Sequence, residues 1–207
     1  MKYDAWEKLA HRYNDQWVQK YSLRPTRREV KKIVFPLLEQ NNDLKILDIG
    51  CGTGQLVAEI SDQYKSVDYL GIDVAKNMID IAVQSNDCDR IKFKNISVDD
   101  FESEEKFDII ICTHAFPYFP DKAGAMLKMG SLCKKGGKVI IVSSSTNNLK
   151  DLIINLAVKT RTSRAKYLSI KQMKNLFSSA GFEVKNVDVI RERSYMPTIA
   201  LFYAEKQ

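Results

Sequence analysis

The feature that most constrains this chain is a short apolar run that leads into three glycines at alternate positions. Lys45–Ile49 has the composition of a buried strand, Gly50, Gly52 and Gly54 follow it, and a helical stretch begins at Gln55. Glycine lacks a Cβ, so the chain can turn sharply there and a ligand can lie directly against the backbone. The pattern predicts a strand, a ligand-binding loop and a helix in succession.

Dinucleotide-binding proteins have a similar loop, with the pattern Gly-x-Gly-x-x-Gly and a pyrophosphate at the start of the helix. Here Gln55 stands where the third glycine would be, and Asp48 lies two residues before the first glycine. A carboxylate at that point repels a pyrophosphate and attracts a ligand that carries ammonium and sulfonium charges. The loop therefore favours a cationic ligand over a dinucleotide.

Strands alternate with helices along most of the chain, which predicts an α/β protein with a parallel sheet. Two N-terminal helices are expected at 3–20 and 26–40, with a break at Ser22–Pro25. The remaining strands are expected at Tyr69–Ile72, Ile91–Ile96, Phe107–Cys112 and Lys138–Ser143, with helices at Gln55–Gln63, Lys76–Gln84 and Asp121–Cys133.

The C-terminal part is expected to close the sheet. A helix is predicted at Asn148–Thr160, and Ser169 has the character of an N-cap for a helix at Ile170–Ala180 that Gly181 ends. The last two strands, Glu183–Arg191 and Thr198–Glu205, can lie antiparallel at one edge of the sheet.

Composition indicates a single globular domain over residues 1–207. The chain is 44% hydrophobic and 28% charged, which is enough for one sizeable core. Its N-terminus lacks an apolar signal region, and no apolar run approaches the roughly 20 residues of a membrane span. The cysteines are scattered and only two histidines occur, so we expect no metal site and a reducing, cytoplasmic location.

The net charge of +6 is unevenly distributed. No acidic residue lies between Asp151 and Glu183, and basic residues fill the segment 159–174. A second basic cluster is formed by Arg24, Arg27, Arg28, Lys31 and Lys32. Either these residues form a solvated surface, or they attract a phosphorylated or nucleic-acid acceptor.

The Asp-x-Gly-x-Gly-x-Gly run from Asp48 to Gly54 resembles the S-adenosylmethionine signature of the class I methyltransferases, particularly the small enzymes of the group that includes ubiquinone and menaquinone methylases. The resemblance implies a Rossmann-like fold with a seven-stranded, mostly parallel sheet, an antiparallel C-terminal strand pair and helices on both faces. It implies S-adenosylmethionine as cofactor and S-adenosylhomocysteine (SAH) as product. Asp48, Gly50, Cys51, Gly52 and Gly54 would surround the methionine part.

Further positions follow from the same resemblance. Asp73, at the tip of the second strand, can accept hydrogen bonds from both ribose hydroxyls. Val74 would pack on the adenine with Met78 nearby, although core packing is an equal alternative for both residues. After the third strand, the backbone of Ser97 and Val98 and the side chain of Asp99 are the candidates for binding the adenine amino group.

The segment Phe107–Asp121 matches the family pattern without a gap, although Pro117 and Tyr118 stand where some members have two histidines. Cys112, Thr113 and His114 would line the pocket near the sulfonium. Lys135-Gly136-Gly137 stands in for Pro-Gly-Gly before the fifth strand, and the resemblance covers roughly residues 30–205.

Transfer of an activated methyl group mainly requires alignment of the nucleophile, and a general base is needed only if the acceptor must lose a proton. His114 is the leading candidate for that base, and Tyr118, Tyr13 and His11 are weaker ones. An aromatic N-terminal group can cap the pocket, although the spacing of its later members also fits core packing on one helical face: Tyr3, Trp6, Tyr13 and Trp17.

We therefore expect a methyltransferase that acts on an oxygen, nitrogen or sulfur atom of a small-molecule acceptor. Residues 1–40 would cap the site, 41–145 would bind the cofactor, and 146–207 would form the acceptor side. A nucleic-acid methyltransferase is the first alternative, but Ala115–Tyr118 lacks the Asp/Asn-Pro-Pro-Tyr/Phe motif of amino-methylating enzymes. A non-catalytic S-adenosylmethionine-binding protein is the second.

Overall fold

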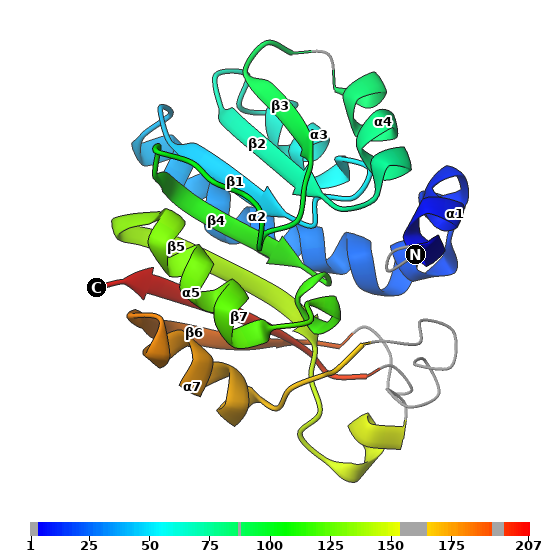
Figure 1. Cartoon of the computed structure of the whole chain (residues 1–207), viewed down its shortest axis with the longest axis vertical. Helices are drawn as coiled ribbons and strands as arrows, with labels where there is room; N and C mark the ends of the chain where they lie inside the picture. The colour runs from blue at the N-terminus through cyan, green and yellow to red at the C-terminus, as the bar shows by residue number, and fades with distance from the viewer. Residues whose placement is uncertain (1–3, 87, 154–164, 192–196) are drawn as a thin grey trace.

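A sheet runs through the centre of the molecule, and seven strands of the described residues form it in the order β3-β2-β1-β4-β5-β7-β6 (Figure 1). The computed structural model describes residues 4–86, 88–153, 165–191 and 197–207. Strands β1 to β5 are parallel, and β7 pairs antiparallel with β5 and β6, as predicted. The bounds are β1 Lys45–Ile49, β2 Asp68–Asp73, β3 Ile91–Asn95, β4 Phe107–Thr113, β5 Cys133–Ser144, β6 Phe182–Ile190 and β7 Ile199–Lys206.

The order of the strands places a crevice at the carboxyl ends of β1 and β4. From β1 the chain moves outward to β2 and β3, and it then crosses to β4 on the other side of β1. The connections after β1 and β4 therefore diverge at this point. In open α/β sheets, ligands bind at such a switch point.

Helices cover both faces of the sheet (Figure 1). On one face α2 and α3 pack on Ile46, and on the other α5 and α7 pack around Leu47, because successive strand residues point to opposite faces. The helices are α1 Asp4–Tyr13, α2 Arg24–Gln40, α3 Gln55–Ser61, α4 Lys76–Ser85, α5 Lys122–Leu132 and α7 Ile170–Ser179, with a π-helical turn η1 Gln19–Leu23 and a 3-10 turn η2 Phe116–Tyr118.

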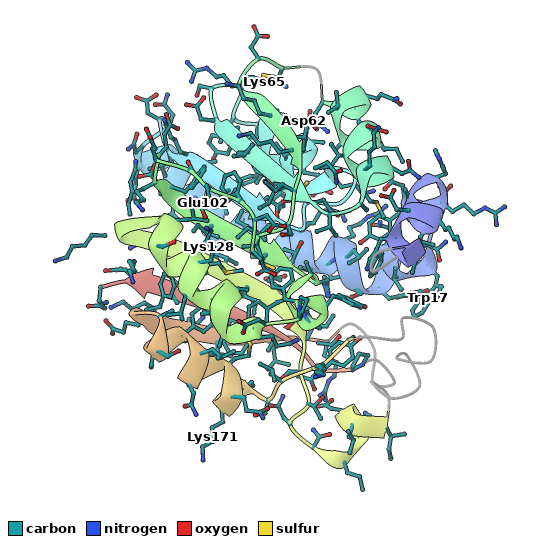
Figure 2. The ribbon with its side chains drawn as sticks, in the orientation of Figure 1. Trp17, Asp62, Lys65, Glu102, Lys128 and Lys171 are labelled. Atoms are coloured by element: carbon teal, nitrogen blue, oxygen red, sulfur yellow. The ribbon has the colours of Figure 1, made fainter. Side chains whose placement is uncertain are left out.

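The N-terminal helices differ from the prediction. The first helix ends at Tyr13 instead of residue 20, and the break expected at Ser22–Pro25 is absent because η1 leads directly into α2. Pro25 fits the first turn of α2, where its missing N–H has no helical partner to lose. Trp17, beyond the end of α1, is 51% exposed and points away from the protein (Figure 2). The prediction that Trp17 shares a helical face with Trp6 and Tyr13 was therefore wrong.

Strand β5 begins earlier than predicted, at Cys133 instead of Lys138. Its pairing with β4 is interrupted between Phe107 and Ile109, and Gly136 adopts a φ of +74° within the irregular stretch. The segment Lys135-Gly136-Gly137, which was expected before the strand, thus forms a bulge inside it. At the C-terminal side, the Ser169 cap is confirmed by a capping box with Gln172. The helix expected at Asn148–Thr160 is observed over 149–153, and its remainder lies outside the described residues.

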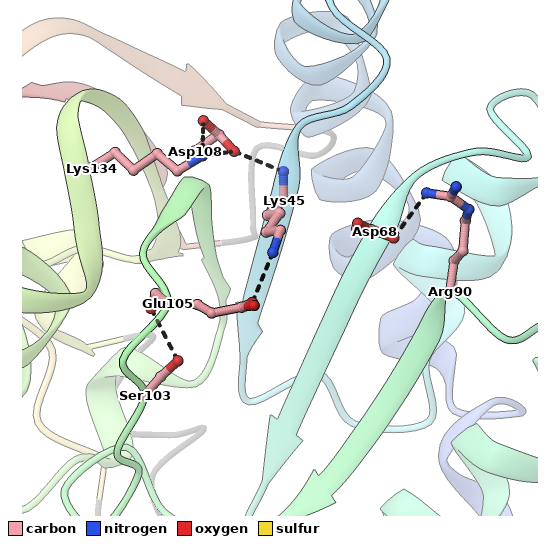
Figure 3. A network of polar contacts seen from close by, with 7 residues as sticks. All are labelled: Lys45, Asp68, Arg90, Ser103, Glu105, Asp108 and Lys134. Atoms are coloured by element: carbon pink, nitrogen blue, oxygen red, sulfur yellow. Dashed lines mark hydrogen bonds and ion pairs between the residues drawn. The ribbon is translucent and has the colours of Figure 1, made fainter.

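The amino ends of the central strands are joined by charged side chains (Figure 3). The backbone N–H of Lys45 donates to Asp108 Oδ2 over 2.9 Å, and its Nζ pairs with Glu105 over 2.8 Å. Lys134 pairs with Asp108 over 2.8 Å. Exposed pairs of this kind contribute little to stability, because water screens them. This edge therefore fixes the ends of β1 and β4 and leaves the opposite, carboxyl edge for chemistry.

Candidate functional site

The glycine loop between β1 and α3 holds three left-handed backbone conformations. The φ angles of Gly50, Gly52 and Gly54 are +78°, +55° and +74°. A Cβ on Gly50 would lie 2.3 Å from the Cβ of Ala115, so glycine at this position lets the loop touch the turn after β4. A Cβ on Gly52 would meet only Tyr13, at 3.8 Å. The loop thus packs tightly at Gly50 and leaves room beside Gly52.

Asp48 is a buried carboxylate directly before this loop. Its side chain is buried, and the hydroxyl of Tyr69 donates to Oδ2 over 2.6 Å. Oδ1 has no hydrogen-bond partner among the described residues. Burial, with a smaller contribution from Asp73, raises the pKa of Asp48 to about 7, while the hydrogen bond from Tyr69 lowers it. A buried oxygen without a donor is costly, which indicates that a ligand supplies the missing partner.

Asp73 ends β2 and holds two backbone amides of the site. Oδ2 accepts from the N–H of Gly52 over 3.0 Å, and Oδ1 accepts from the N–H of Ala75 over 2.9 Å. Burial raises the pKa of Asp73, and the amide hydrogen bonds partly oppose that effect. Asp73 therefore ties the glycine loop to the start of α4, and each of its oxygens keeps a further lone pair for a ligand hydroxyl.

Helix α1 lies beside this region and is fastened to α4 by Glu7. The two carboxylate oxygens of Glu7 accept from the N–H groups of Lys76 and Asn77 over 2.7 and 2.8 Å. Helix α4 has no capping side chain of its own at Ala75, so Glu7 satisfies its free amides. Helix α1 is therefore held at the edge of the site by α4.

Aromatic rings from α1 and η2 meet next to that joint. The ring of Trp6 lies 6.3 Å from that of Tyr13 and 5.1 Å from that of Tyr118, both edge to face. Met78 is buried in the same cluster as Trp6, while Val74 is half-buried. Burial raises the pKa of Tyr13, which keeps its hydroxyl protonated at neutral pH. These side chains form an apolar wall beside the glycine loop.

His114 lies in the turn after β4 and has an unusual backbone. Its φ is +59°, the only positive value for a non-glycine residue among those described. Its N–H donates to Val142 O over 2.6 Å, and Nε2 lies 2.8 Å from Oγ1 of Thr26. Burial, with a smaller contribution from Arg27, lowers the pKa of His114 to about 4. The imidazole is therefore neutral throughout the neutral pH range and is aimed at α2.

Arg27 of α2 is a site residue that the sequence analysis grouped with surface charges. It is only 8% exposed and donates to Glu59, Gln19 and Gln55 over 2.7, 3.1 and 2.9 Å. The sequence could have indicated this burial, because Arg27 lies three residues before the apolar Val30 and therefore on the same, inner face of α2. Those bonds use Nε and Nη1, and Nη2 makes no hydrogen bond to a side chain or backbone group of the described residues.

A small cavity of about 40 Å³ lies between the glycine loop, Arg27 and His114. Its lining includes seven of the predicted site residues, namely Tyr13, Asp48, Gly50, Cys51, Gly52, Thr113 and His114. It also includes residues that were not predicted: Leu23, Thr26, Arg27, Thr53, Gln55 and Leu56. Four predicted site residues near it are not part of its lining: Asp73, Val74, Met78 and Tyr118. Pockets for cofactor-sized ligands usually measure about 300–1,000 Å³. In the described conformation, α1 and α2 therefore close the site to a fraction of that volume.

The other predicted residues lie outside the lining. Ser97 donates to Asp100 over 2.7 Å, Val98 is buried in the core and Asp99 is exposed. Cys112 is fully buried on β4, and burial raises the pKa of its thiol. Gly54 packs against α4, where a Cβ would lie 2.8 Å from the amide nitrogen of Asn86. His11 is exposed on α1.

A larger hollow, of about 750 Å³, lies at the opposite edge of the sheet. It is lined by residues 38–42 and 63–66, which precede the amino ends of β1 and β2. Parallel sheets bind ligands at the carboxyl ends of their strands. We therefore locate the candidate site at the smaller cavity, which has the buried carboxylate and the glycine loop.

Comparison with known proteins identifies the family of the chain. A family model described as a methyltransferase domain matches residues 7–187. A malonyl-[acyl-carrier protein] O-methyltransferase of Acetivibrio thermocellus is 30% identical over 100 residues, 48% of this chain and 35% of that protein. A ubiquinone biosynthesis O-methyltransferase of Leptothrix cholodnii is 26% identical over 149 residues, 67% of this chain and 60% of that protein.

Among solved structures, a magnesium protoporphyrin IX methyltransferase from Synechocystis PCC 6803 with bound SAH superposes with a TM-score of 0.73. Its sequence is 16% identical, and the match covers 93% of this chain and 88% of that chain. The fold is thus that of the class I, S-adenosylmethionine-dependent methyltransferases. Because the family model spans most of the sequence, the chain belongs to the methyltransferase domain family.

The chain matches only part of the length of these relatives. The chain spans 35% and 60% of the length of the two relatives named above. Among the described helices, none combines the length and the apolar character needed to cross a membrane.

Proposed function

We propose that the chain binds S-adenosylmethionine at the glycine loop and transfers its methyl group to an oxygen, nitrogen or sulfur atom of a small molecule. The observation that carries this proposal is the buried carboxylate of Asp48, whose Oδ1 has no partner among the described residues. It lies directly before a loop whose amide at Gly52 is held by Asp73. The membership of the methyltransferase domain family supports the same reaction.

The charges around the cavity suit the two ends of an amino acid. A carboxylate at Asp48 can accept hydrogen bonds from an ammonium group, and the guanidinium of Arg27 lines the same cavity. Arginine presents a fork of N–H donors that matches a carboxylate. We infer that Asp48 binds the ammonium and Arg27 the carboxylate of the methionine part, while Asp73 binds the ribose hydroxyls.

The bound cofactor supplies an electrophilic methyl group on a sulfonium, so the protein mainly positions the acceptor and excludes water. His114 lines the cavity and its imidazole is neutral, so it can take a proton from the acceptor, although its lowered pKa makes it a weak base. Tyr13 and Tyr118 are suited to shape the acceptor side, since the ring of Trp6 contacts both. The protonated hydroxyl of Tyr13 can donate a hydrogen bond to the acceptor.

The enclosure of the site supports a small-molecule acceptor. Side chains of α1 and α2 line a cavity of about 40 Å³ together with the glycine loop, so the reacting groups lie beneath two helices. The relatives named above are O-methyltransferases of ubiquinone biosynthesis and of a malonyl-carrier protein. We infer a cytoplasmic protein, which the four free cysteines support.

Calorimetry followed by a transfer assay tests the proposal. Titration with S-adenosylmethionine and with SAH is expected to give dissociation constants between about 1 μM and 1 mM. Release of labelled methyl to a panel of small phenols, carboxylic acids, amines and thiols is then expected, with none to RNA. Failure to bind either compound would refute the proposal. Binding without transfer to any acceptor would favour a non-catalytic role, and transfer to RNA would overturn the acceptor class.

A further inference from the structure

The buried pair formed by Tyr69 and Asp48 belongs to two neighbouring strands. Asp48 of β1 is in register with Gly71 of β2, and Tyr69 lies two residues before Gly71 on the same face of the sheet. The hydroxyl of Tyr69 reaches Asp48 and donates to Oδ2 over 2.6 Å. Both side chains are 2% exposed.

Because of this bond, the two carboxylate oxygens of Asp48 differ in their hydrogen-bond partners. Oδ2 is occupied by the phenol, and Oδ1 has no partner among the described residues although Asp48 lines the cavity. A carboxylate held at one oxygen cannot rotate freely. The phenol therefore fixes the plane of the carboxylate and leaves one oxygen for a cation.

Among the residues that the structure describes, no cation that faces Asp48 already neutralises it. Apart from burial, the hydrogen bond from Tyr69 lowers the pKa of Asp48, and the charge of Asp73 raises it. The other titratable side chains around it come from the loop, from α1 and α2, and from β4 with its following turn: Cys51, Tyr13, Arg27, Cys112 and His114. Of these, the one cation is Arg27, which is paired with Glu59 over 2.7 Å.

We infer that Tyr69 is a positioning residue for cofactor binding, because it holds Asp48 with one oxygen free for the cofactor's ammonium and favours the ionised carboxylate that this ammonium requires. The inference rests on the proposed function, which supplies the cation. Binding then displaces the carboxyl proton to solvent, so cofactor affinity rises with pH. Since burial raises the pKa of Asp48 to about 7, this change falls in the neutral range.

The alternative hypothesis, that Tyr69 has a purely structural role, predicts a different pH dependence of binding. If the phenol only filled space and satisfied a buried oxygen, its removal would lower stability or weaken binding equally at every pH. A positioning role predicts that the loss of binding depends on pH, because without the donor Asp48 stays protonated to higher pH.

The test is calorimetry of the full chain with SAH and with S-adenosylmethionine from pH 6 to pH 9. We expect the affinity of the unmodified protein to rise up to about tenfold per pH unit below the pKa of Asp48, then to level off, and to fall once the α-ammonium of the ligand loses its proton. Titration in two buffers of different ionisation enthalpy is expected to show release of about half a proton at pH 7. For Tyr69→Phe we expect affinity about fivefold or more below that of the unmodified protein at pH 7, and similar affinity at pH 9.

Two further variants complete the experiment. Tyr64→Phe is the matched control, because its hydroxyl bonds to Glu39 and to the Phe35 carbonyl, away from the site, and it is expected to bind like the unmodified protein. Asp48→Asn is expected to bind weakly and without the rise in affinity between pH 6 and pH 7, which tests the titration of Asp48 even if Tyr69→Phe fails to fold. Equal affinity at all pH values for Tyr69→Phe, or uniform weakening, would overturn the inference while leaving the proposed function intact. An unmodified protein that binds neither compound would refute both.

Discussion

Oγ1 of Thr26 lies 2.8 Å from Nε2 of His114, which joins helix α2 to the turn after β4. The two residues are 88 positions apart in the sequence, and this contact brings an N-terminal helix to the reaction side of the sheet. It also fixes the orientation of an imidazole whose backbone already adopts a rare conformation. His114 is therefore held at both its backbone and its ring, as the proposed base should be.

His114→Asn is expected to change the pH dependence of stability. Burial lowers the pKa of folded His114 to about 4, so the unfolded chain binds more protons below the ordinary value of 6.5. Stability from this group is present above pH 6.5 and is lost as the pH falls towards 4, with a slope of at most about 1.4 kcal/mol per pH unit. Asparagine tolerates the positive φ and cannot titrate.

Urea unfolding between pH 5 and pH 7.5 measures that slope. The unmodified protein is expected to lose more stability than His114→Asn on acidification, and His11→Asn, on the exposed face of α1, is the control. Identical slopes for the unmodified protein and His114→Asn would show that the pKa of His114 is the same in the folded and the unfolded chain.

Asp73→Ala is expected to weaken S-adenosylmethionine binding by about 1.5–3 kcal/mol, the range for a lost hydrogen bond to a charged group. The carboxylate holds the N–H groups of Gly52 and Ala75, so the variant also loosens the loop. Calorimetry checks this, with Asp80→Ala as control because Asp80 pairs only with Lys76 in an exposed contact. Unchanged affinity in a folded Asp73→Ala protein would place the nucleoside elsewhere.

Gly52→Val is expected to abolish tight cofactor binding. A side chain at a φ of +55° costs about 1–2 kcal/mol of strain, and it would occupy the space between the loop and Tyr13. Gly136→Ala separates these effects, because Gly136 has a φ of +74° with no atom within 4 Å of the added Cβ. It should lose stability and keep its affinity in thermal melts and calorimetry. Normal binding by Gly52→Val would contradict the proposed site.

A triple change of Arg161, Arg164 and Lys166 to Gln distinguishes the two acceptor classes. Lys166 is exposed, and the two arginines lie outside the described residues. We expect unaltered cofactor affinity, because the cationic side chain of the cavity is Arg27. Filter binding with RNA at physiological salt checks the alternative, since phosphate contacts weaken steeply with salt. Sub-micromolar RNA binding that disappears in this variant would overturn the small-molecule assignment.

The parts of the site that are continuous in sequence could be predicted. The glycine loop, Asp48 and Asp73 follow from short patterns at strand ends, and the order of elements predicted the sheet. The partnership of Tyr69 with Asp48 could not be predicted in the same way, because it depends on the register between β1 and β2. Arg27 was missed for another reason. Because it is charged, it was assigned to a surface cluster, although its spacing from Val30 places it on the inner face of α2.

The antiparallel course of β7 determines where the protein can be attached without disturbing the site. Glu205 pairs with Lys138 at the start of the regular part of β5, so the chain ends at the edge where the parallel strands begin (Figure 1). Helix α1, in contrast, carries Trp6 and Tyr13 at the opposite edge. A sensor surface or fluorescent label linked after β7 would therefore lie at the edge away from the cavity, whereas the same linkage ahead of α1 would lie beside residues that line it.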